Sequence, residues 1–270
     1  MACLDGKVAI VAGAGPGIGR ACAAALRREG ADVVVAARDA ARLEAMVAEM
    51  LAGADADADA DAQTPHGPAL LPVAFDFADL DSCKALTQQA LGQFGRIDIL
   101  VNVATAGGET SAVADGEWQS WRQAFEVNVI GTMELSRLAA EAMRTNPGGS
   151  IVQVGTIGTR ALPPGRSRYT ATKSAMVTAS LTMAKELGRS GVRVNVVTPG
   201  FTTGAPLTAM TESIARRTGE SAEEVSARMA AGAALRRHVD PVDVAAAVAF
   251  LAGPGARNVT GIELPVTAGR

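Results

Sequence analysis

The pair of residues best suited to acid–base chemistry is Tyr169 and Lys173, four positions apart in a chain of 270 residues whose only tyrosine is Tyr169. On a helix, residues four apart lie on one face, with Cβ atoms about 5–6 Å apart. An ammonium beside a phenol favours the phenolate, so a tyrosine in that setting can exchange a proton near neutral pH. A surface helix without function can carry the same spacing, and the rest of the chain must decide between the two interpretations.

A glycine-rich turn lies between a buried strand predicted over 7–12 and a helix predicted over 20–29. Its glycines follow the spacing G-x-x-x-G-x-G through Gly13, Gly17 and Gly19. In the order strand, turn, helix, backbone N–H groups and the positive end of the helix hold a phosphate. Glycine is needed there because a Cβ would block the approach. The turn therefore predicts a pyrophosphate site.

The end of the second strand, predicted over 32–36, indicates which dinucleotide is bound. A carboxylate at this position selects the free 2′-hydroxyl of the adenine ribose, whereas an arginine accommodates a 2′-phosphate. The chain offers Ala37 and then Arg38, so NADP(H) is favoured over NAD(H). Asp39 is interpreted as the cap of the following helix, which is predicted to run to about residue 51.

Further polar side chains stand at the ends of predicted strands or inside a helix. Asp76 and its neighbour Phe77 follow the strand over 70–75, where a carboxylate meets adenine or caps a turn. Thr156 ends the strand over 150–156. Asn128 lies inside one long helix predicted over 118–144, and an asparagine there is unfavourable unless a contact justifies it.

The alternation of strands and helices continues through the chain. A helix is predicted to run to 94, a strand over 97–102, and a helix from Tyr169 to about 187. A strand over 192–197 is interrupted by Thr198, Pro199 and Gly200, and a helix over 240–252 precedes a closing strand over 262–266. This alternation predicts an α/β fold with one doubly wound parallel sheet, Rossmann-like, in a single domain over 1–270 with helices on both faces.

Two segments depart from the alternation. Residues 53–68 contain an alternating Ala-Asp run and then Gln-Thr-Pro-His-Gly-Pro, which predicts a flexible surface loop. Residues 201–238 read as a loop with two short helices, an excursion large enough to cover a substrate site. Its apolar residues suggest an apolar substrate, although apolar residues at helical spacing usually form core.

Composition argues against several classes of protein. A net charge of −3 offers no basic surface for nucleic acid or membrane, and no apolar run approaches the ~18–20 residues that span a bilayer. The cysteines (Cys3, Cys22, Cys83) and histidines (His66, His238) are few and widely spaced, so neither a disulfide framework nor a metal site is expected. The start of the chain lacks a signal-peptide layout, and a cytoplasmic location is predicted.

With these pieces placed, nearly the whole chain resembles the short-chain dehydrogenase/reductase family. The family's T-G-x-x-x-G-I-G corresponds to residues 12–19, its N-N-A-G to 102–105, and its P-G element to 199–200. Its helix asparagine matches Asn128, its Y-x-x-x-K matches Tyr169 and Lys173, and its serine, thirteen residues before the tyrosine, falls on Thr156. The ordered set is far more specific than any one member.

The resemblance implies a role for each of the four residues of the catalytic set. Tyr169 would protonate the carbonyl oxygen in reduction, or take the alcohol proton in oxidation. Lys173 would favour the phenolate and hold the nicotinamide ribose. Thr156 would hydrogen-bond the substrate oxygen, and Asn128 would anchor a water that links Lys173 to solvent.

The resemblance also implies which residues bind the cofactor. The glycine turn would hold phosphate, Arg38 the 2′-phosphate, and Asp76 the adenine. Asn102 and Ala104 would serve the adenosine-side ribose or the strand register, and Thr202 or Thr203 the nicotinamide end. The full predicted set is Gly13, Gly15, Pro16, Gly17, Ile18, Gly19, Arg38, Asp76, Phe77, Asn102, Ala104, Tyr169, Lys173, Pro199, Gly200, Thr202 and Thr203.

The chain departs from the family pattern at several positions. Ala12 stands in place of a threonine that braces the glycine turn, and Val103 and Thr105 replace the second asparagine and the glycine of N-N-A-G. The hydroxyl after the P-G element comes one position earlier than in the family. Thr156 keeps the hydroxyl of the family serine, but its methyl group stiffens χ1 and takes up space near the carbonyl.

Three functions are weighed on these grounds. The first is hydride transfer between NADP(H) and a carbonyl or secondary alcohol, with Tyr169, Lys173, Thr156 and Asn128 as the catalytic set. The second is a 3-oxoacyl-carrier-protein reductase, because loop arginines at 160, 166 and 168 would attract an acidic carrier. The third is a non-catalytic dinucleotide-binding sensor or scaffold. The resemblance implies a homodimer or homotetramer through the helices of Asn128 and Tyr169.

Overall fold

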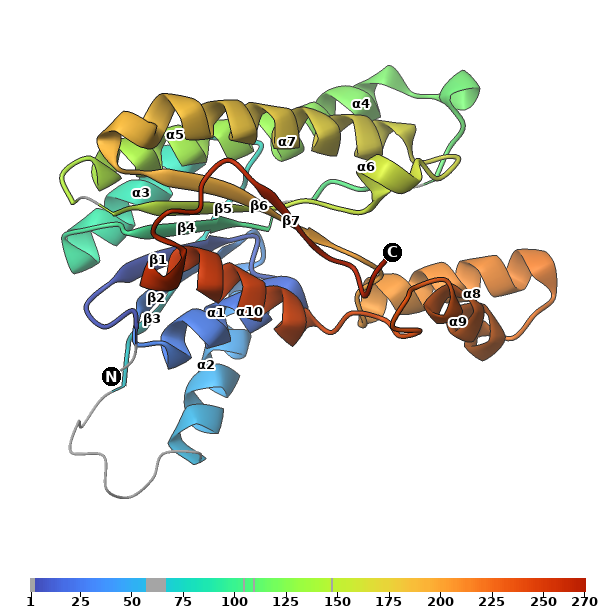
Figure 1. The fold of residues 1–270 in the computed structure, drawn as a ribbon, viewed down its shortest axis with the longest axis horizontal. Helices are drawn as coiled ribbons and strands as arrows, with labels where there is room; N and C mark the ends of the chain where they lie inside the picture. Colours follow the sequence, from blue (N-terminus) through green and yellow to red (C-terminus); the bar gives the residue numbers. More distant parts are fainter. Residues whose placement is uncertain (1–2, 57–66, 104, 109, 147) are drawn as a thin grey trace.

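A computed structural model describes residues 3–56, 67–103, 105–108, 110–146 and 148–270. Its centre is a seven-stranded parallel sheet in the order β3-β2-β1-β4-β5-β6-β7. Helices cover both faces (Figure 1). The predicted doubly wound Rossmann-like fold is confirmed. The strands are β1 (Val8–Ala12), β2 (Asp32–Ala37), β3 (Leu70–Ala74), β4 (Ile99–Asn102), β5 (Ser150–Val154), β6 (Arg193–Pro199) and β7 (Glu263–Val266).

The helices divide between the two faces of the sheet, as Figure 1 shows, and short helical turns connect them. The longer helices are α1 (Ile18–Arg28), α2 (Ala40–Ala56), α3 (Leu80–Phe94), α4 (Trp118–Phe125), α5 (Thr132–Met143), α7 (Ser167–Leu187), α8 (Ala205–Thr218), α9 (Ala222–Ala231) and α10 (Pro241–Ala252). The short elements are η1 (Val113–Asp115), η2 (Glu126–Gly131), α6 (Gly158–Ala161), η3 (Gly188–Ser190) and η4 (Pro254–Ala256).

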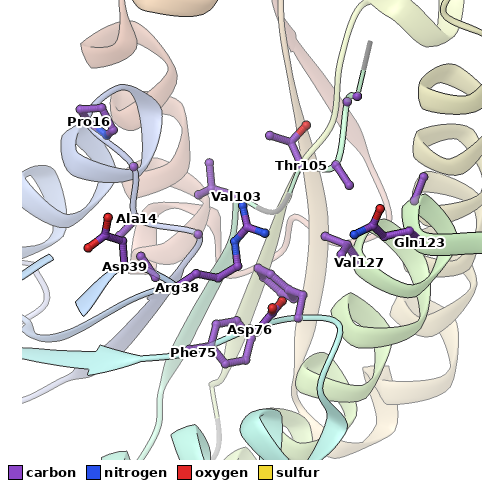
Figure 2. Close-up of a pocket in the computed structure, with 18 of the residues that line it drawn as sticks. Ala14, Pro16, Arg38, Asp39, Phe75, Asp76, Val103, Thr105, Gln123 and Val127 are labelled. Carbon is purple, nitrogen blue, oxygen red and sulfur yellow. The ribbon is translucent and has the colours of Figure 1, made fainter. Parts of the chain in front are cut away.

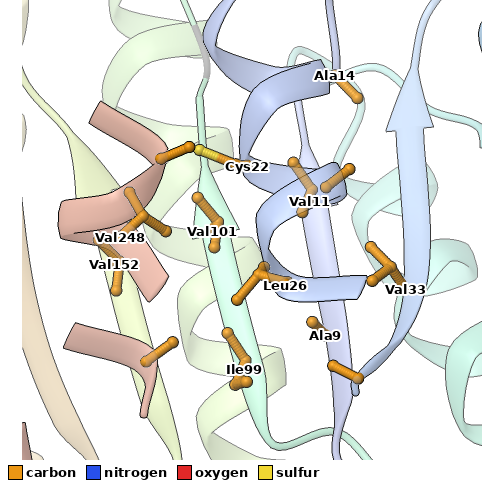
Figure 3. Close-up of a cluster of buried hydrophobic side chains, with 14 of the residues drawn as sticks. Ala9, Val11, Ala14, Cys22, Leu26, Val33, Ile99, Val101, Val152 and Val248 are labelled. Atoms are coloured by element: carbon orange, nitrogen blue, oxygen red, sulfur yellow. The ribbon is translucent and has the colours of Figure 1, made fainter. Parts of the chain in front are cut away.

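Each face of the sheet has its own apolar core because successive strand residues point to opposite sides. On β1, Ala9 and Val11 join the core under α1 and α10, whereas Ile10 and Ala12 join the core under α3 and α5. Leu26 of α1 is fully buried in the first core (Figure 3). Burial of one such side chain stabilises the fold by about 1.5–3 kcal/mol. The continuous apolar runs of the strands are thus explained by cover on both faces.

The helix predicted over 118–144 is continuous but not uniform. It begins as α4, passes through the π-helical segment η2, and continues as α5. A π-helix bonds i to i+5 and widens the helix locally, often at a functional site. The backbone of η2 also packs tightly, since a Cβ on Gly131 would overlap the carbonyl oxygen of Phe77. Residue periodicity does not reveal such an inserted residue.

Several predicted boundaries are wrong. The helix α2 continues to Ala56, so the loop predicted over 53–68 does not begin at residue 53, and most of that loop (57–66) lies outside the described residues. Strand β6 continues through Thr198 and Pro199 because both still pair with β7. Strand β5 ends at Val154, two residues before its predicted end, and the segment that carries the loop arginines begins with the short helix α6.

The excursion over 201–238 carries α8 and α9, which project from the body of the molecule (Figure 1). It has a small apolar cluster of its own around Leu207, Val225 and Met229. The end of the chain is tied to it: Leu235 N–H donates to Ala268 O at 3.0 Å, and the Arg270 guanidinium lies 4.4 Å from the centre of the Phe201 ring. Within the described part of the chain, no helix combines the length and apolarity that a bilayer crossing requires.

Candidate active site

Tyr169 and Lys173 lie one turn apart near the start of α7, as their spacing predicts. Tyr169 is partly exposed, whereas Lys173 is buried with 3% of its surface accessible. The Lys173 ammonium donates to the carbonyl oxygen of Val154, the last residue of β5, at 2.8 Å. The Lys173 side chain is therefore fixed to the end of a central strand, one helical turn along α7 from Tyr169.

Burial changes the acid–base behaviour of Lys173. Desolvation disfavours the charged ammonium and lowers the pKa of Lys173 from 10.5 to about 7. An amine whose pKa lies near neutrality changes charge within the range in which the protein works. It can therefore exchange a proton with water or with a neighbouring group at little cost.

Asn128 lies in the π-helical segment η2 and is completely buried. Its Oδ1 accepts from the backbone N–H of Ala106 at 2.7 Å, and its Nδ2 donates to the Thr172 hydroxyl at 3.0 Å. The asparagine thus joins the segment after β4 to helix α7, next to Lys173. These contacts supply the justification that an asparagine inside a helix requires.

Thr156 lies just beyond β5, beside the first turns of α7. Its Oγ1 accepts from the backbone N–H of Gly158 at 3.1 Å, which leaves its own hydroxyl hydrogen to donate elsewhere. A Cβ on Gly158 would lie 3.4 Å from Thr156 Oγ1 and 3.4 Å from Thr170 Cγ2, so little space separates the threonine from α7. In the described part of the chain no hydrogen bond joins the hydroxyls of Thr156 and Tyr169.

The glycine turn after β1 has two kinds of glycine. A Cβ on Gly19 would lie 2.6 Å from Ala14 Cα, so Gly19 is required for packing of α1 on the turn. Added Cβ atoms on Gly15 and Gly17 would meet no protein atom within 4 Å. The helix begins at Ile18 after Gly17, which supplies no side-chain cap, and the Arg20 N–H donates to Gly15 O at 2.9 Å. This geometry fits a pyrophosphate on the backbone and at the helix N-terminus.

A cavity of about 1500 Å³ runs from this turn across the carboxyl ends of the strands toward α4. Figure 2 shows Arg38 reaching from the end of β2 into the middle of the cavity, near Phe75 and Asp76. Arg20 and Arg42 also line the wall but form ion pairs with Glu49 and Asp39. The predicted residues that line the cavity are Gly13, Gly15, Pro16, Arg38, Asp76 and Phe77.

The carboxylates at the ends of β2 and β3 are engaged locally. Asp39 accepts from the Arg42 backbone N–H at 3.1 Å, so its predicted role as a helix cap is confirmed. Asp76 accepts from the Ala78 N–H at 3.0 Å and caps a turn, while its side chain also faces the cavity. The turn-capping interpretation is confirmed, and the contact of Asp76 with adenine stays a prediction.

Asn102 does not face the cavity. Its side chain is buried under α5, where its Nδ2 donates to the Ser136 hydroxyl at 3.0 Å. The side chain ties β4 to the covering helix, which agrees with the second of its two predicted roles, and a contact of Asn102 with a ribose stays a prediction. Ala104, its predicted companion, lies outside the described residues.

Other residues predicted to bind the cofactor do not line the cavity, and contacts within the protein hold them in place. Ile18 packs on the core under α1. Pro199 pairs with Val266 of β7, and Gly200 follows, where a Cβ would lie 2.9 Å from Thr267 Cα. The Thr202 hydroxyl donates to Gly200 O at 3.2 Å, and the Thr203 N–H donates to Val239 O at 2.9 Å.

Sequence reasoning missed several contacts of the site. The Thr172 hydroxyl accepts a hydrogen bond from the Asn128 side-chain amide, and the Ala106 backbone N–H donates to the oxygen of the same side chain. No sequence pattern predicts either contact. The loop arginines 166 and 168 were expected to face an acidic partner. They turn inward instead: Arg166 Nη1 donates to Gly108 O at 3.3 Å, and Arg168 donates to Gly107 O and to the Ser120 hydroxyl.

Comparison with known proteins gives the same class as the fold and the site. A family model described as Enoyl-(Acyl carrier protein) reductase matches residues 13–270. An uncharacterized oxidoreductase of Methylorubrum extorquens is 35% identical, the alignment covering 100% of this chain and 99% of the relative. A 3-oxoacyl-[acyl-carrier-protein] reductase of Synechocystis is 31% identical over 100% of this chain and 98% of the relative. The structure of L-sorbose reductase from Gluconobacter frateurii, complexed with NADPH and L-sorbose, superimposes with a TM-score of 0.89 at 26% identity, covering 100% and 98% of the two chains.

The chain therefore belongs to the short-chain dehydrogenase/reductase family. It is an oxidoreductase that uses a nicotinamide dinucleotide. The hypothesis of a non-catalytic sensor or scaffold is set aside on this ground.

Proposed function

We propose that this protein transfers a hydride between NADP(H) and a carbonyl or secondary alcohol, with Tyr169 as the general acid or base. The observation that carries the proposal is the placement of Tyr169 one helical turn from a buried Lys173 whose ammonium is fixed to Val154. Thr172 lies next to Lys173 on α7, and its hydroxyl accepts a hydrogen bond from Asn128. When bound, the nicotinamide supplies or accepts the hydride.

The protein's own residues would then act on the proton and on position. In reduction Tyr169 gives its hydroxyl proton to the carbonyl oxygen, and in oxidation it takes the alcohol proton. Thr156, whose hydroxyl hydrogen remains available, donates to the same substrate oxygen. Lys173 replaces the proton lost from Tyr169, because its lowered pKa lets it exchange protons near neutral pH. Asn128 holds the loop and helix together around this path.

The preference for NADP(H) rests on Arg38. This arginine lines the cavity at the end of β2, and in the described part of the chain no ion pair engages its guanidinium. Because the other two arginines of that wall are already paired with carboxylates, Arg38 is the charge that a 2′-phosphate would meet. Gly13, Gly15 and Gly17 would hold the pyrophosphate, and Thr202 or Thr203 the nicotinamide end.

The test is direct. Purified protein is given NADPH and a panel of carbonyl compounds, and loss of NADPH absorbance is followed for the wild type and for Tyr169→Phe. We expect turnover in the wild type and its loss in the variant, with circular dichroism showing an unchanged fold. Undiminished turnover by Tyr169→Phe would falsify the assignment. An Arg38→Ala variant should lose affinity for NADPH much more than for NADH.

A second candidate, 3-oxoacyl-carrier-protein reductase, is favoured by the Synechocystis relative. The arginines that suggested it are less available than the sequence indicates. Arg166 and Arg168 bond to the loop at 107–108, and Arg160 pairs with Glu263 at 3.2 Å. Turnover of one 3-oxoacyl group is compared on an acyl carrier protein and on a short thiol. A strong preference for the carrier-bound form supports this candidate, and equal rates reject it.

A homodimer or homotetramer in the cytoplasm completes the proposal. Phe125 and Ile130 lie on the helical run that contains Asn128 and expose 37% and 50% of their surfaces, which supports contact with a second copy there. Light scattering on the purified protein tests the assembly: a monomer at all concentrations would contradict it. Cell fractionation tests the location.

A further inference from the structure

Two loops are tied together beside Tyr169. One follows β4 (residues 105–108 and 110–111), and the other leads into the first residues of α7 (162–168). The Ser111 N–H donates to Gly165 O at 3.0 Å, Arg166 Nη1 donates to Gly108 O at 3.3 Å, and Arg168 Nη2 donates to Gly107 O at 3.4 Å. The start of α7 is thus fixed to the segment that Asn128 also holds.

Within this junction, Arg166 covers the ring of Tyr169. The guanidinium carbon lies 4.9 Å from the ring centre, within the range of a cation–π contact. A Cβ on Gly107 would lie 3.2 Å from Arg166 Nη2 and 4.0 Å from Tyr169 Cδ2. The Gly107 backbone, the guanidinium and the phenol ring therefore pack against one another, and a side chain at 107 would require the guanidinium to shift.

We propose that Arg166 is a positioning residue for Tyr169: its guanidinium, held by Gly108, fixes the plane of the phenol ring and adds a positive charge beside it. The proposal rests on the proposed acid–base role of Tyr169. The arrangement comes from this chain's own loop residues.

Other charged groups also lie around the tyrosine. Lys173 lies one turn further along α7. Arg168 points away from the ring toward Ser120 of α4 and Gly107. Asp115 and Glu117, from η1 and the start of α4, line the cavity on the same side as Arg168. Arg166 is the guanidinium in contact with the Tyr169 ring itself.

Replacement of Arg166 should leave the fold intact. The residue is the N-cap of α7, but its side chain makes no capping hydrogen bond, and its carbonyl serves the helix in any residue type. Arg166→Met removes charge and hydrogen bonds while keeping a long side chain, and Arg166→Lys keeps the charge. Arg122→Met is the matched control, because Arg122 is exposed on the neighbouring α4 and does not line the cavity.

The experiment measures kcat and KM for alcohol oxidation in these variants, with thermal unfolding of each. We expect Arg166→Met to lower kcat by about tenfold, with a smaller change in KM and an unchanged Tm. Arg166→Lys should recover most of kcat, and Arg122→Met should match the wild type. A residue that only joins the two loops would change stability or KM and leave kcat unchanged.

The role of Arg166 and the proposed function fail on different outcomes. An unchanged kcat in Arg166→Met overturns the role of Arg166. Full activity in Tyr169→Phe instead overturns the proposed function, whatever the Arg166 variants do.

Discussion

Thr156 differs from the family serine by one methyl group, and in the structure this methyl group leaves the hydrogen bonding of the hydroxyl intact. The Oγ1 of Thr156 accepts a backbone N–H of Gly158, and this bond orients the hydroxyl so that its hydrogen remains to be donated. In the proposed mechanism this residue has to donate a single hydrogen bond to a substrate oxygen. A threonine in this backbone setting can supply it as a serine does.

Thr156→Ser should therefore retain kcat/KM within a few-fold, whereas Thr156→Ala should lose about 10²-fold or more, as expected for removal of one donor to a developing charge. Steady-state kinetics on the best carbonyl substrate measures both, and thermal unfolding checks that the alanine variant is folded. Equal activity of the two variants would show that Thr156 is structural.

Lys173 carries a cost in stability that depends on pH. Its pKa is lowered to about 7 in the folded protein, so the unfolded chain binds a proton that the folded chain releases between about pH 7 and 10.5. Stability consequently rises with pH across this window, and the cost of the buried ammonium is complete below about pH 7. The same burial that suits the lysine for proton exchange weakens the fold.

We expect Lys173→Met to raise the Tm of the cofactor-free protein below pH 7, with a difference that shrinks as the pH approaches 10, while activity is lost. Thermal unfolding at several pH values measures this. Lys185→Met is the control, because Lys185 lies exposed on the same helix and should show no such trend. A difference that is constant with pH would contradict the account.

At the scale of elements, the π-helical segment η2 is what brings Asn128 to the site. The segment packs so closely on the chain after β3 that Gly131 has no space for a side chain above Phe77. Phe77 in turn lines the cavity. One glycine thus connects the shape of this helix to the wall of the cofactor site.

Gly131→Ala should lower stability by about 1–3 kcal/mol, because a backbone oxygen has to move, and should weaken dinucleotide binding through Phe77. Gly92→Ala on α3 is the control, since its Cβ meets nothing within 4 Å, and it should stabilise the helix by roughly 0.5–1 kcal/mol. Denaturant unfolding and a binding titration measure both effects. A stable Gly131→Ala variant would show that the contact relaxes easily.

The sequence predicted the elements better than their ends. Apolar runs marked the central strands because these are covered on both faces, and the glycine turn marked one end of the cavity. The apolar pattern did not reveal the π-helical segment, which is defined by its backbone hydrogen bonds. It also left open whether Asn102 meets a ribose or serves the strand register, since strand position does not tell which of two faces a side chain takes. The pairing of Arg166 with Tyr169 depends on two loops whose meeting no local pattern encodes.

For the whole molecule, the position of the α8–α9 excursion depends on the final residues of the sequence. Residues 268–269 bond to 234–235, and Arg270 stacks on Phe201 at the start of the excursion. The excursion also has a positive φ of 52° at Arg236 and of 125° at Gly204, one near each end. We propose that it covers the substrate, because it follows the carboxyl end of β6, at the edge of the sheet where the other strands meet the cavity.

Arg270→Ala should therefore loosen 201–238 without loosening the sheet, because the guanidinium that it removes lies on the Phe201 ring. Hydrogen exchange followed by mass spectrometry should show faster exchange in 201–238 by about tenfold, with β1 and β4 unchanged, and KM for substrate should rise. Arg257→Ala, at an exposed position elsewhere, serves as the control. Faster exchange throughout the protein would contradict a local role.

The two tryptophans of the chain both lie on α4, with ring centres 5.7 Å apart, and Trp118 exposes 60% of its surface. The same helix lines the cavity through Ser120 and Gln123. The intrinsic fluorescence of the protein is therefore a local signal from the wall of the cofactor site. Reduced nicotinamide absorbs where indole emits, so cofactor binding can be titrated by energy transfer in the unlabelled protein, including variants that have lost all turnover.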